Sequence, residues 1–252
     1  MDAAAVLAAF DAQLRADPPP EAGVERVWAD GVLRTVGAYN FIGWWDLTAD
    51  QAPAAAAREA AHFRALGEEV EWKVFSHDRP AGLEAHLAAA GFVDDGPETL
   101  LVLDQTLTRL EEAPPPGIEV RRVVDRDGVA DLVTANTAAF GKAEPWRVDA
   151  LTPRLDDGSL ALYVAYADGR PVSSGRLELA PGRDFAGLYG GGTDPAWRGR
   201  GVYRALVAAR AAEARRLGVR YLTVDARDTS RPILQRLGFQ ALATITGWVL
   251  KP

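Results

Sequence analysis

The sequence contains no cysteine, a single methionine and only three histidines in 252 residues. Without cysteine, the chain has no disulfide framework, no thiolate zinc site and no cysteine nucleophile. The histidines, His62, His77 and His86, all lie in the first half. A histidine base acting in the second half would therefore have to come from a segment distant in sequence.

Long apolar runs and an excess of basic charge are also absent. No run approaches the roughly 20 apolar residues that cross a bilayer, and the first residues mix acids into an amphipathic pattern unlike that of a signal peptide. We therefore expect a cytoplasmic protein. The formal net charge is −7 at pH 7, which argues against general binding to a phosphate backbone, so we expect neither nucleic acid nor membrane as a partner.

The composition that is present suits a folded protein of two modest domains. Hydrophobic residues make up 48% and charged residues 25% of the chain, enough to bury a core. The clearest break is the proline run at 114–116, followed by Gly117, because such punctuation marks linkers. We predict a first domain at 1–104, a linker at 105–117 and a second domain at 118–252.

Hydrophobic periodicity predicts interleaved helices and strands in both halves. In the first half we expect helices at 3–15, 50–66 and 80–90, strands at 39–45, 70–77 and 99–104, and a hairpin that turns at Asp30 and Gly31. In the second half we expect strands at 117–123, 160–180, 184–193, 219–226 and 243–250. Helices are expected at 126–139 and 145–154, after Gly201 and from Ser230. This pattern predicts an α/β fold with a mixed sheet flanked by helices.

The two halves also share an order of sequence features. Each has an alanine-rich helix that ends in Leu-Gly, then a strand, then a helix that opens with Arg-Pro and stops at Gly-Phe, at 91–92 and 238–239. We interpret this as two copies of one domain. The alternative is that these glycines are ordinary helix stops, since glycine readily ends a helix in the left-handed conformation.

The segment DPAWRGRGVYRAL, at 194–206, carries the clearest chemical signal. A helix start presents unpaired backbone N–H groups and a partial positive charge, and glycine lets an anion approach the backbone closely. With Arg198 and Arg200 beside them, these features suit a pyrophosphate. The sequence has no Walker A string, and the glycines at 187–192 are not followed directly by a helix, which disfavours a Rossmann site. A solvated basic turn is the alternative.

This segment resembles motif A of the GNAT N-acetyltransferases, in which (Q/R)xxGx(G/A) leads into the helix that binds the coenzyme A pyrophosphate. Tyr203 stands where the family has Gly or Ala. The resemblance covers residues 118–252, with SRPILQRLGF similar to the motif B helix. It implies tandem GNAT-like domains, each a twisted mixed β-sheet flanked by helices, of which the first is degenerate because DLTADQAPAAAA replaces the basic glycine loop.

The resemblance implies an acetyl-CoA-dependent N-acetyltransferase without a metal, in which a small-molecule or peptide amine attacks the thioester directly in a ternary complex. The strand before the loop would lie beside the pantetheine and polarise the thioester carbonyl. The coenzyme-binding residues implied are Gly191, Gly192, Thr193, Arg198, Gly199, Arg200, Gly201, Val202 and Tyr203.

The general acid and base are less evident. Many family members have a tyrosine acid in the motif B helix, where this sequence has Leu234. Tyr189, Tyr203 or bulk water are the alternatives. For the base we consider Glu178 and Asp225, because partial burial on a strand raises the pKa of a carboxyl group. Each carboxylate is alternatively an ordinary salt-bridged or solvated group.

Several aromatic residues are candidates for an acceptor cleft. Core packing is the alternative for Tyr39, Phe41, Trp44 and Trp45, and ordinary helix packing is the alternative for Phe140 and Trp146. His77, at a strand end, is the histidine we would inspect for a role. The missing tyrosine and the degenerate first domain also suit a second function, that of a non-catalytic acyl-CoA-binding sensor or scaffold. The two functions differ in whether an amine releases free thiol from acetyl-CoA.

Overall fold

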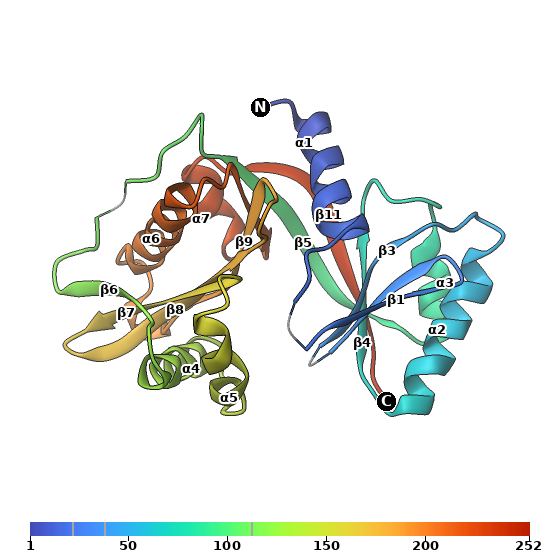
Figure 1. Ribbon diagram of the computed structural model, residues 1–252, viewed down its shortest axis with the longest axis horizontal. Coiled ribbons are helices and arrows are strands. Elements are labelled where there is room, and N and C mark those ends of the chain that lie inside the picture. Colours follow the sequence, from blue (N-terminus) through green and yellow to red (C-terminus); the bar gives the residue numbers. More distant parts are fainter. Residues whose placement is uncertain (22, 38, 112) are drawn as a thin grey trace. The chain divides into compact units, whose positions relative to one another are not determined.

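The computed structural model describes residues 1–21, 23–37, 39–111 and 113–252 (Figure 1). These residues form two compact units. The N-terminal unit consists of residues 2–100, 225–231 and 241–252, and the C-terminal unit of residues 101–224 and 232–240, together with Met1. In the expected linker, Glu112 lies outside the described residues, and the others join two strands without a helix or strand of their own.

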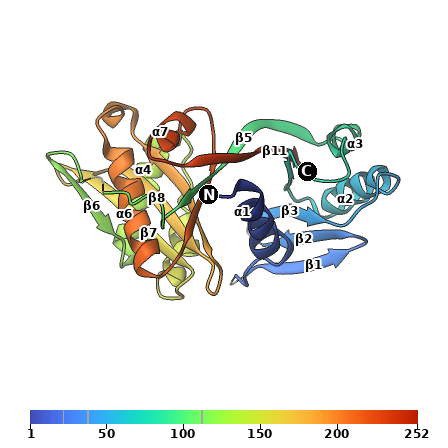
Figure 2. The ribbon, with the colours of Figure 1, turned by 90° about the horizontal axis from the view of Figure 1, so that it is seen from above.

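The N-terminal unit has strands in the order β1-β2-β3-β4-β11. Its helices are α1 (Ala3–Phe10), which continues as a π-helical turn at Asp11–Ala16, α2 (Ala52–Leu66) and α3 (Leu83–Ala90). Its strands are β1 (Glu25–Ala29), β2 (Val32–Val36), β3 (Asn40–Trp45), β4 (Val70–Phe75) and most of β11 (Gln240–Leu250). Figures 1 and 2 show β1, β2 and β3 side by side, with α2 and α3 across the strands from α1.

The hairpin and the core of this unit follow from its sequence. Asp30 and Gly31 have φ angles of 45° and 83°, and two consecutive positive φ angles are typical of the two-residue turn that joins twisted strands. Trp72 of β4 is fully buried and meets Trp45 and Phe92 edge-on, with ring centroids 5.6 and 6.2 Å away. Trp45, a sequence candidate for a cleft, is therefore largely a core residue.

The C-terminal unit has strands in the order β10-β9-β8-β7-β6. These strands are β6 (Ile118–Arg122), β7 (Leu160–Ala167), β8 (Arg170–Leu179), β9 (Phe185–Thr193) and β10 (Tyr221–Ala226). The helices are α4 (Arg126–Phe140), α5 (Arg147–Leu151), α6 (Val202–Arg216) and α7 (Arg231–Arg236), and β5 (Val93–Asp104) is divided between the units after Leu100. Figure 1 shows α6 on one face of β7 and β8, and α4 with α5 on the other.

In each unit, the described residues include a pair of parallel strands that separate after three residue pairs. Residues 40–42 of β3 lie beside 70–72 of β4, and residues 185–187 of β9 lie beside 221–223 of β10. Both second strands lead into a short helix that stops at a left-handed glycine, Gly91 at φ 97° and Gly238 at φ 98°. The repeated order of elements is thus present in the backbone, and the predicted mixed α/β fold is confirmed.

The last strand does not pack in the domain to which the expected boundaries, 1–104 and 118–252, assign it. Residues 245–250 of β11 pair with residues 70–75 of β4, antiparallel and in continuous register. This pairing is why residues 241–252 belong to the N-terminal unit. Within the described ranges, no helix is long and apolar enough to cross a membrane.

Candidate functional site

The basic glycine segment forms the start of α6, as its sequence indicated. Gly201 is the N-cap residue at φ 85°, without a side-chain cap, and Gly199 has φ 73°. The first helical hydrogen bond runs from the N–H of Ala205 to the carbonyl of Gly201, 3.1 Å apart. The N–H groups of the first turn have no partner within the helix. They are therefore available to an anion at the positive end of the helix dipole.

The two arginines of this segment have different surroundings. Arg198 donates from Nε to the carbonyl of Thr193 and from Nη2 to that of Ala139, both at 3.0 Å. It thereby ties the loop to β9 and to α4. Arg200 is exposed and stacks over the ring of Trp197, with Cζ 4.8 Å from the ring centroid. Arg200 is thus the arginine whose charge is free to meet a ligand.

The glycines of β9 form a β-bulge. The register between β8 and β9 shifts so that Gly175 faces both Gly190 and Gly191, and Gly190 has φ 58°. A bulge takes backbone groups out of the ladder and turns them to a new direction. Asn136 of α4 donates to the carbonyl of Gly190 at 3.2 Å. Sequence reasoning missed Asn136, because its position in the middle of a helix gives no sign of this partner.

Gly192 lets α4 approach the sheet closely. A Cβ atom at Gly192 would lie 2.6 Å from the ring of Phe140 and 2.7 Å from Cβ of Ala139. The next residue, Thr193, is buried, and its hydroxyl lies 2.8 Å from that of Ser173. Phe140 therefore lies against the candidate coenzyme strand while 58% of it stays exposed.

Trp146, the other candidate acceptor contact in the C-terminal unit, is also exposed. It stacks with Arg147, whose Cζ lies 5.5 Å from the ring centroid. Phe140 and Trp146 are 58% and 52% exposed. Phe140 also packs against Gly192, so its exposure is compatible with ordinary helix packing, the alternative to an acceptor contact. Their contact with an acceptor stays a prediction.

Tyr203 and Arg210 meet at Gly191. A Cβ atom at Gly191 would lie 3.1 Å from the Tyr203 ring and 3.4 Å from Nη2 of Arg210. Burial raises the pKa of Tyr203, and the nearby charge of Arg210 opposes the rise. Arg210 was not a sequence candidate, although its spacing of four residues from buried Leu206 places it on the apolar face of α6.

The catalytic candidates of the C-terminal unit lie around Arg176. Glu178 forms an ion pair with Arg176 at 3.1 Å, and Tyr189 faces Arg176 across the β8–β9 ladder. The Tyr189 ring covers Gly187, where an added Cβ atom would lie 2.2 Å from it. Leu234 is fully buried. The structure thus brings Glu178 and Tyr189 together, and their catalytic roles stay predictions.

Asp225 belongs to the N-terminal unit, where it accepts a hydrogen bond from Nζ of Lys73 at 2.9 Å. Glu98 lies 3.9 Å from the same ammonium group. Burial raises the pKa of Glu98, although Lys73 lowers it. Glu98 is a carboxyl group that sequence reasoning missed, and it shares the Lys73 ammonium group with Asp225.

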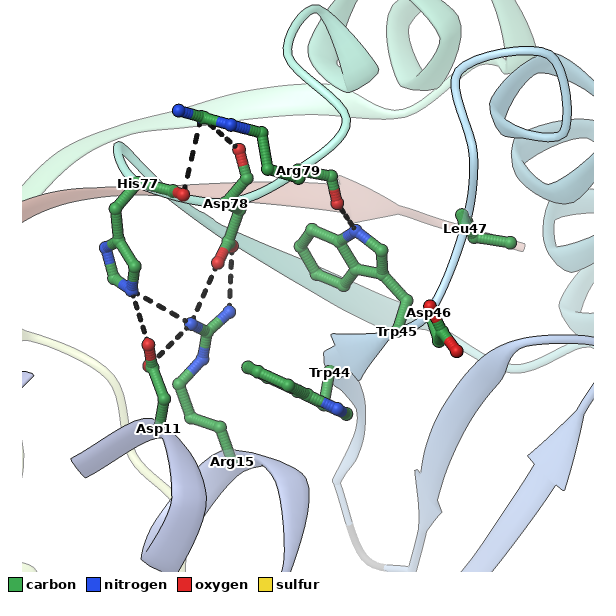
Figure 3. A pocket seen from close by; sticks show the side chains of 9 residues that line it. All are labelled: Asp11, Arg15, Trp44, Trp45, Asp46, Leu47, His77, Asp78 and Arg79. Carbon is green, nitrogen blue, oxygen red and sulfur yellow. Dashed lines mark hydrogen bonds and ion pairs between the residues drawn. The ribbon is translucent and has the colours of Figure 1, made fainter. Parts of the chain in front are cut away.

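In the N-terminal unit, the side chains of Arg15 and Asp78 occupy the space where β3 and β4 separate (Figure 3). Arg15 donates from Nε to the carbonyl of Gly43 at 3.0 Å and makes two bonds to Asp78, at 2.9 and 2.8 Å. Asp78 also accepts the N–H of Phe75 at 2.8 Å. The Arg15–Asp78 pair thereby satisfies backbone groups of both β3 and β4.

Beside this pair remains a pocket of about 300 Å³, whose aromatic wall is Trp44 and Trp45. His77 lines it as well, with Nε2 2.7 Å from a carboxylate oxygen of Asp11 (Figure 3). Trp44 and Trp45 thus line a pocket inside the N-terminal unit. Tyr39 is exposed and forms a hydrogen bond with Glu71. Among the described residues, no group of histidine and carboxylate side chains is arranged to hold a metal ion.

The loop of the N-terminal unit that corresponds to the α6 start is closed by its own side chains. Gln51 accepts the N–H of Thr48 at 2.9 Å. Pro53 lacks an N–H in the first turn of α2, and Asp46 and Asp50 carry negative charge. This loop would repel a pyrophosphate rather than attract it.

Comparison with known proteins finds one family model that matches part of the chain. Residues 129–239 match the sequence model of the Acetyltransferase (GNAT) family. No curated protein has a significantly matching sequence.

Solved structures share the fold over nearly the whole chain. A GCN5-related N-acetyltransferase from Kribbella flavida aligns with a TM-score of 0.70 at 16% identity, covering 99% of this chain and 94% of that one. A tandem GNAT protein from the clavulanic acid biosynthesis pathway aligns with a TM-score of 0.66 at 14% identity, covering 99% and 94%. A GCN5-related N-acetyltransferase from Sphaerobacter thermophilus aligns at 0.63 and 15% identity, covering 99% and 91%. The predicted resemblance is confirmed, and these structures show the fold.

Proposed function

Residues 129–239 form a domain of the GNAT acetyltransferase family, and from this premise we propose that the chain is an acetyl-CoA-dependent N-acetyltransferase. The acceptor is a small-molecule or peptide amine, and the amine attacks the thioester directly in a ternary complex. The cytoplasmic location expected from the sequence is part of this proposal.

One contrast supports the proposal above all others. The start of α6 has two left-handed glycines and the exposed Arg200, whereas the corresponding loop of the N-terminal unit bonds to itself and carries acids. A Cβ atom at Gly199 would meet nothing within 4 Å, so the backbone there is open to a pyrophosphate. These residues fit coenzyme A, and the N-terminal unit is the degenerate copy.

The chain's own residues would align the reactants and stabilise charge. The bulge at Gly190 and Gly191 frees backbone groups for the pantetheine and for the thioester oxygen. Arg198 and Asn136 hold the loop and the bulge in place. The amine loses its proton to Glu178, to Asp225 or to water, and the bound pair gains rate from its fixed orientation.

The test is calorimetric titration of acetyl-CoA into the parent protein, Gly199→Glu and the matched control Gly218→Glu. Gly199 and Gly218 lie at opposite ends of α6, with φ 73° and 79° and open space beside each. Both variants therefore add the same charge and the same backbone strain. We expect Gly199→Glu to bind acetyl-CoA at least about tenfold more weakly than the parent protein. A charge repulsion of about 1.4 kcal/mol is enough to raise the dissociation constant tenfold. Equal binding by all three proteins would refute the coenzyme site.

The second function, a non-catalytic acyl-CoA-binding sensor or scaffold, is favoured by one observation. Leu234, where many relatives have the acid, is fully buried and has no ionisable group. Amine-dependent release of free thiol from acetyl-CoA separates the two functions. Release at the rate of the protein-free reaction, with acetyl-CoA bound, would support the sensor.

A further inference from the structure

Arg210 is a buried cation that has no carboxylate partner in the part of the chain that the structure describes. It is 1% exposed, and its bonds go to the carbonyls of Leu206 from Nε at 3.1 Å and of Arg176 from Nη1 at 3.0 Å. Within the described ranges, no carboxylate forms an ion pair with Arg210 and none of its hydrogen bonds uses Nη2. A buried charge without a counter-charge is costly. The arrangement therefore favours an anion beside Nη2.

The groups around Arg210 leave its charge uncompensated. Burial lowers the pKa of Arg210 to about 10, still well above neutral pH. Burial raises the pKa of Tyr203 and raises that of Tyr163 to about 12, so both phenols stay neutral. Arg176 on β8 adds a second positive charge nearby. Gly175 provides the room, because a Cβ atom there would lie 2.7 Å from the guanidinium.

Nη2 lies next to the strand that carries the proposed thioester site. It lies 3.4 Å from the position that a Cβ atom would take at Gly191. We propose that Arg210 stabilises the departing thiolate of coenzyme A, in place of a tyrosine acid that would protonate it. This inference rests on the proposed function and explains how buried Leu234 is compatible with catalysis.

The step balances without a further reactant. The amine nitrogen forms a bond to the carbonyl carbon, the carbon–sulfur bond breaks, and sulfur leaves with the electron pair. The proton of the amine goes to the base. The guanidinium of Arg210 then holds the thiolate as an ion pair until coenzyme A dissociates and takes a proton from water.

The test measures the pKa of the thiol of bound coenzyme A, from its thiolate ultraviolet absorbance against the desulfo-coenzyme A complex. We expect the thiol of coenzyme A bound to the parent protein to titrate at least about one pH unit below the free thiol, as an opposite charge at close range produces. Arg210→Lys should keep part of the shift. Arg210→Met, similar in size but neutral, should abolish it.

The outcomes separate this inference from the proposed function. If acetyl-CoA binds the parent protein and the bound thiol titrates like the free thiol, Arg210 does not hold the thiolate, while the proposed function stands. Equal thiol pKa values in the Lys and Met variants would also overturn the inference. If no coenzyme A derivative binds the parent protein, both fail. A thiol that titrates like the free thiol in the parent complex overturns the inference even if a variant does not fold.

Discussion

The two units each bury an arginine, and the partners of the two residues differ. Arg15 is 6% exposed and bonds to the carboxylates of Asp78 and Asp11. Its guanidinium also lies 3.9 Å from the centroid of the Phe75 ring. Among the described residues, Arg210 donates only to carbonyl groups. One guanidinium is neutralised and closes a gap between strands, whereas the other keeps its charge available.

Replacement of Arg15 tests the first of these roles. Arg15→Met leaves two carboxylates without their buried cation, so we expect the free energy of unfolding of the N-terminal unit to fall by about 3–5 kcal/mol. Urea denaturation followed by circular dichroism measures the loss. Adding Asp78→Asn to Arg15→Met should restore part of it. A loss below about 1 kcal/mol would mean that the Arg15–Asp78 pair does not stabilise the gap.

Among the secondary-structure elements, β9 depends most on small residues. Its bulge needs Gly190 for the positive φ angle, and its contact with α4 needs Gly192 for space. Gly190 is thus needed for its backbone angle, and Gly192, two residues later, for its lack of a side chain. A substitution at Gly192 therefore tests helix packing without changing a left-handed backbone angle.

Gly192→Ala should destabilise the C-terminal unit by about 1–3 kcal/mol, because the added methyl group overpacks the contact with α4. Chemical denaturation of the parent and the variant gives the difference. In a Phe140→Ala background the same substitution should cost less, since the ring at 2.6 Å is removed. Equal costs in the two backgrounds would show that Phe140 does not make the close contact.

The order of elements could be predicted from the sequence, whereas their long-range partners could not. Alternating apolar residues and Leu-Gly stops mark strands and helix ends locally, and the α6 glycine loop has a local signature too. The bonds of Arg15 to Asp78 and of Asn136 to Gly190 join residues 63 and 54 positions apart. Nothing near any of these residues in sequence specifies its partner.

On the scale of the whole molecule, the most consequential pairing is that of β11 with β4. Ile245 and Leu250 are almost fully buried, and Leu250 packs in one core cluster with Val70 and Phe63. The alternation of residues in β11 is the same whichever strand lies beside it. That is why the sequence placed this strand with the second domain.

Removal of residues 241–252 should unfold the N-terminal unit and leave the C-terminal unit folded. The deletion exposes the edge of β4 and removes part of its core. Limited proteolysis followed by mass spectrometry should show cleavage between residues 2 and 100 and protection between 118 and 224. Deletion of only the exposed Lys251 and Pro252 is the control. Protection of both units in the longer deletion would contradict the prediction.

The same pairing has a consequence for synthesis on the ribosome. Residues 2–100 emerge first, yet their β4 edge stays open until residues 245–250 have been made. At about 5–20 residues per second, the delay is on the order of ten seconds. During that time an open strand edge is a template for association with other nascent chains. The half of the protein that is translated first is therefore the half that finishes folding last, and it is the half on which a chaperone would act.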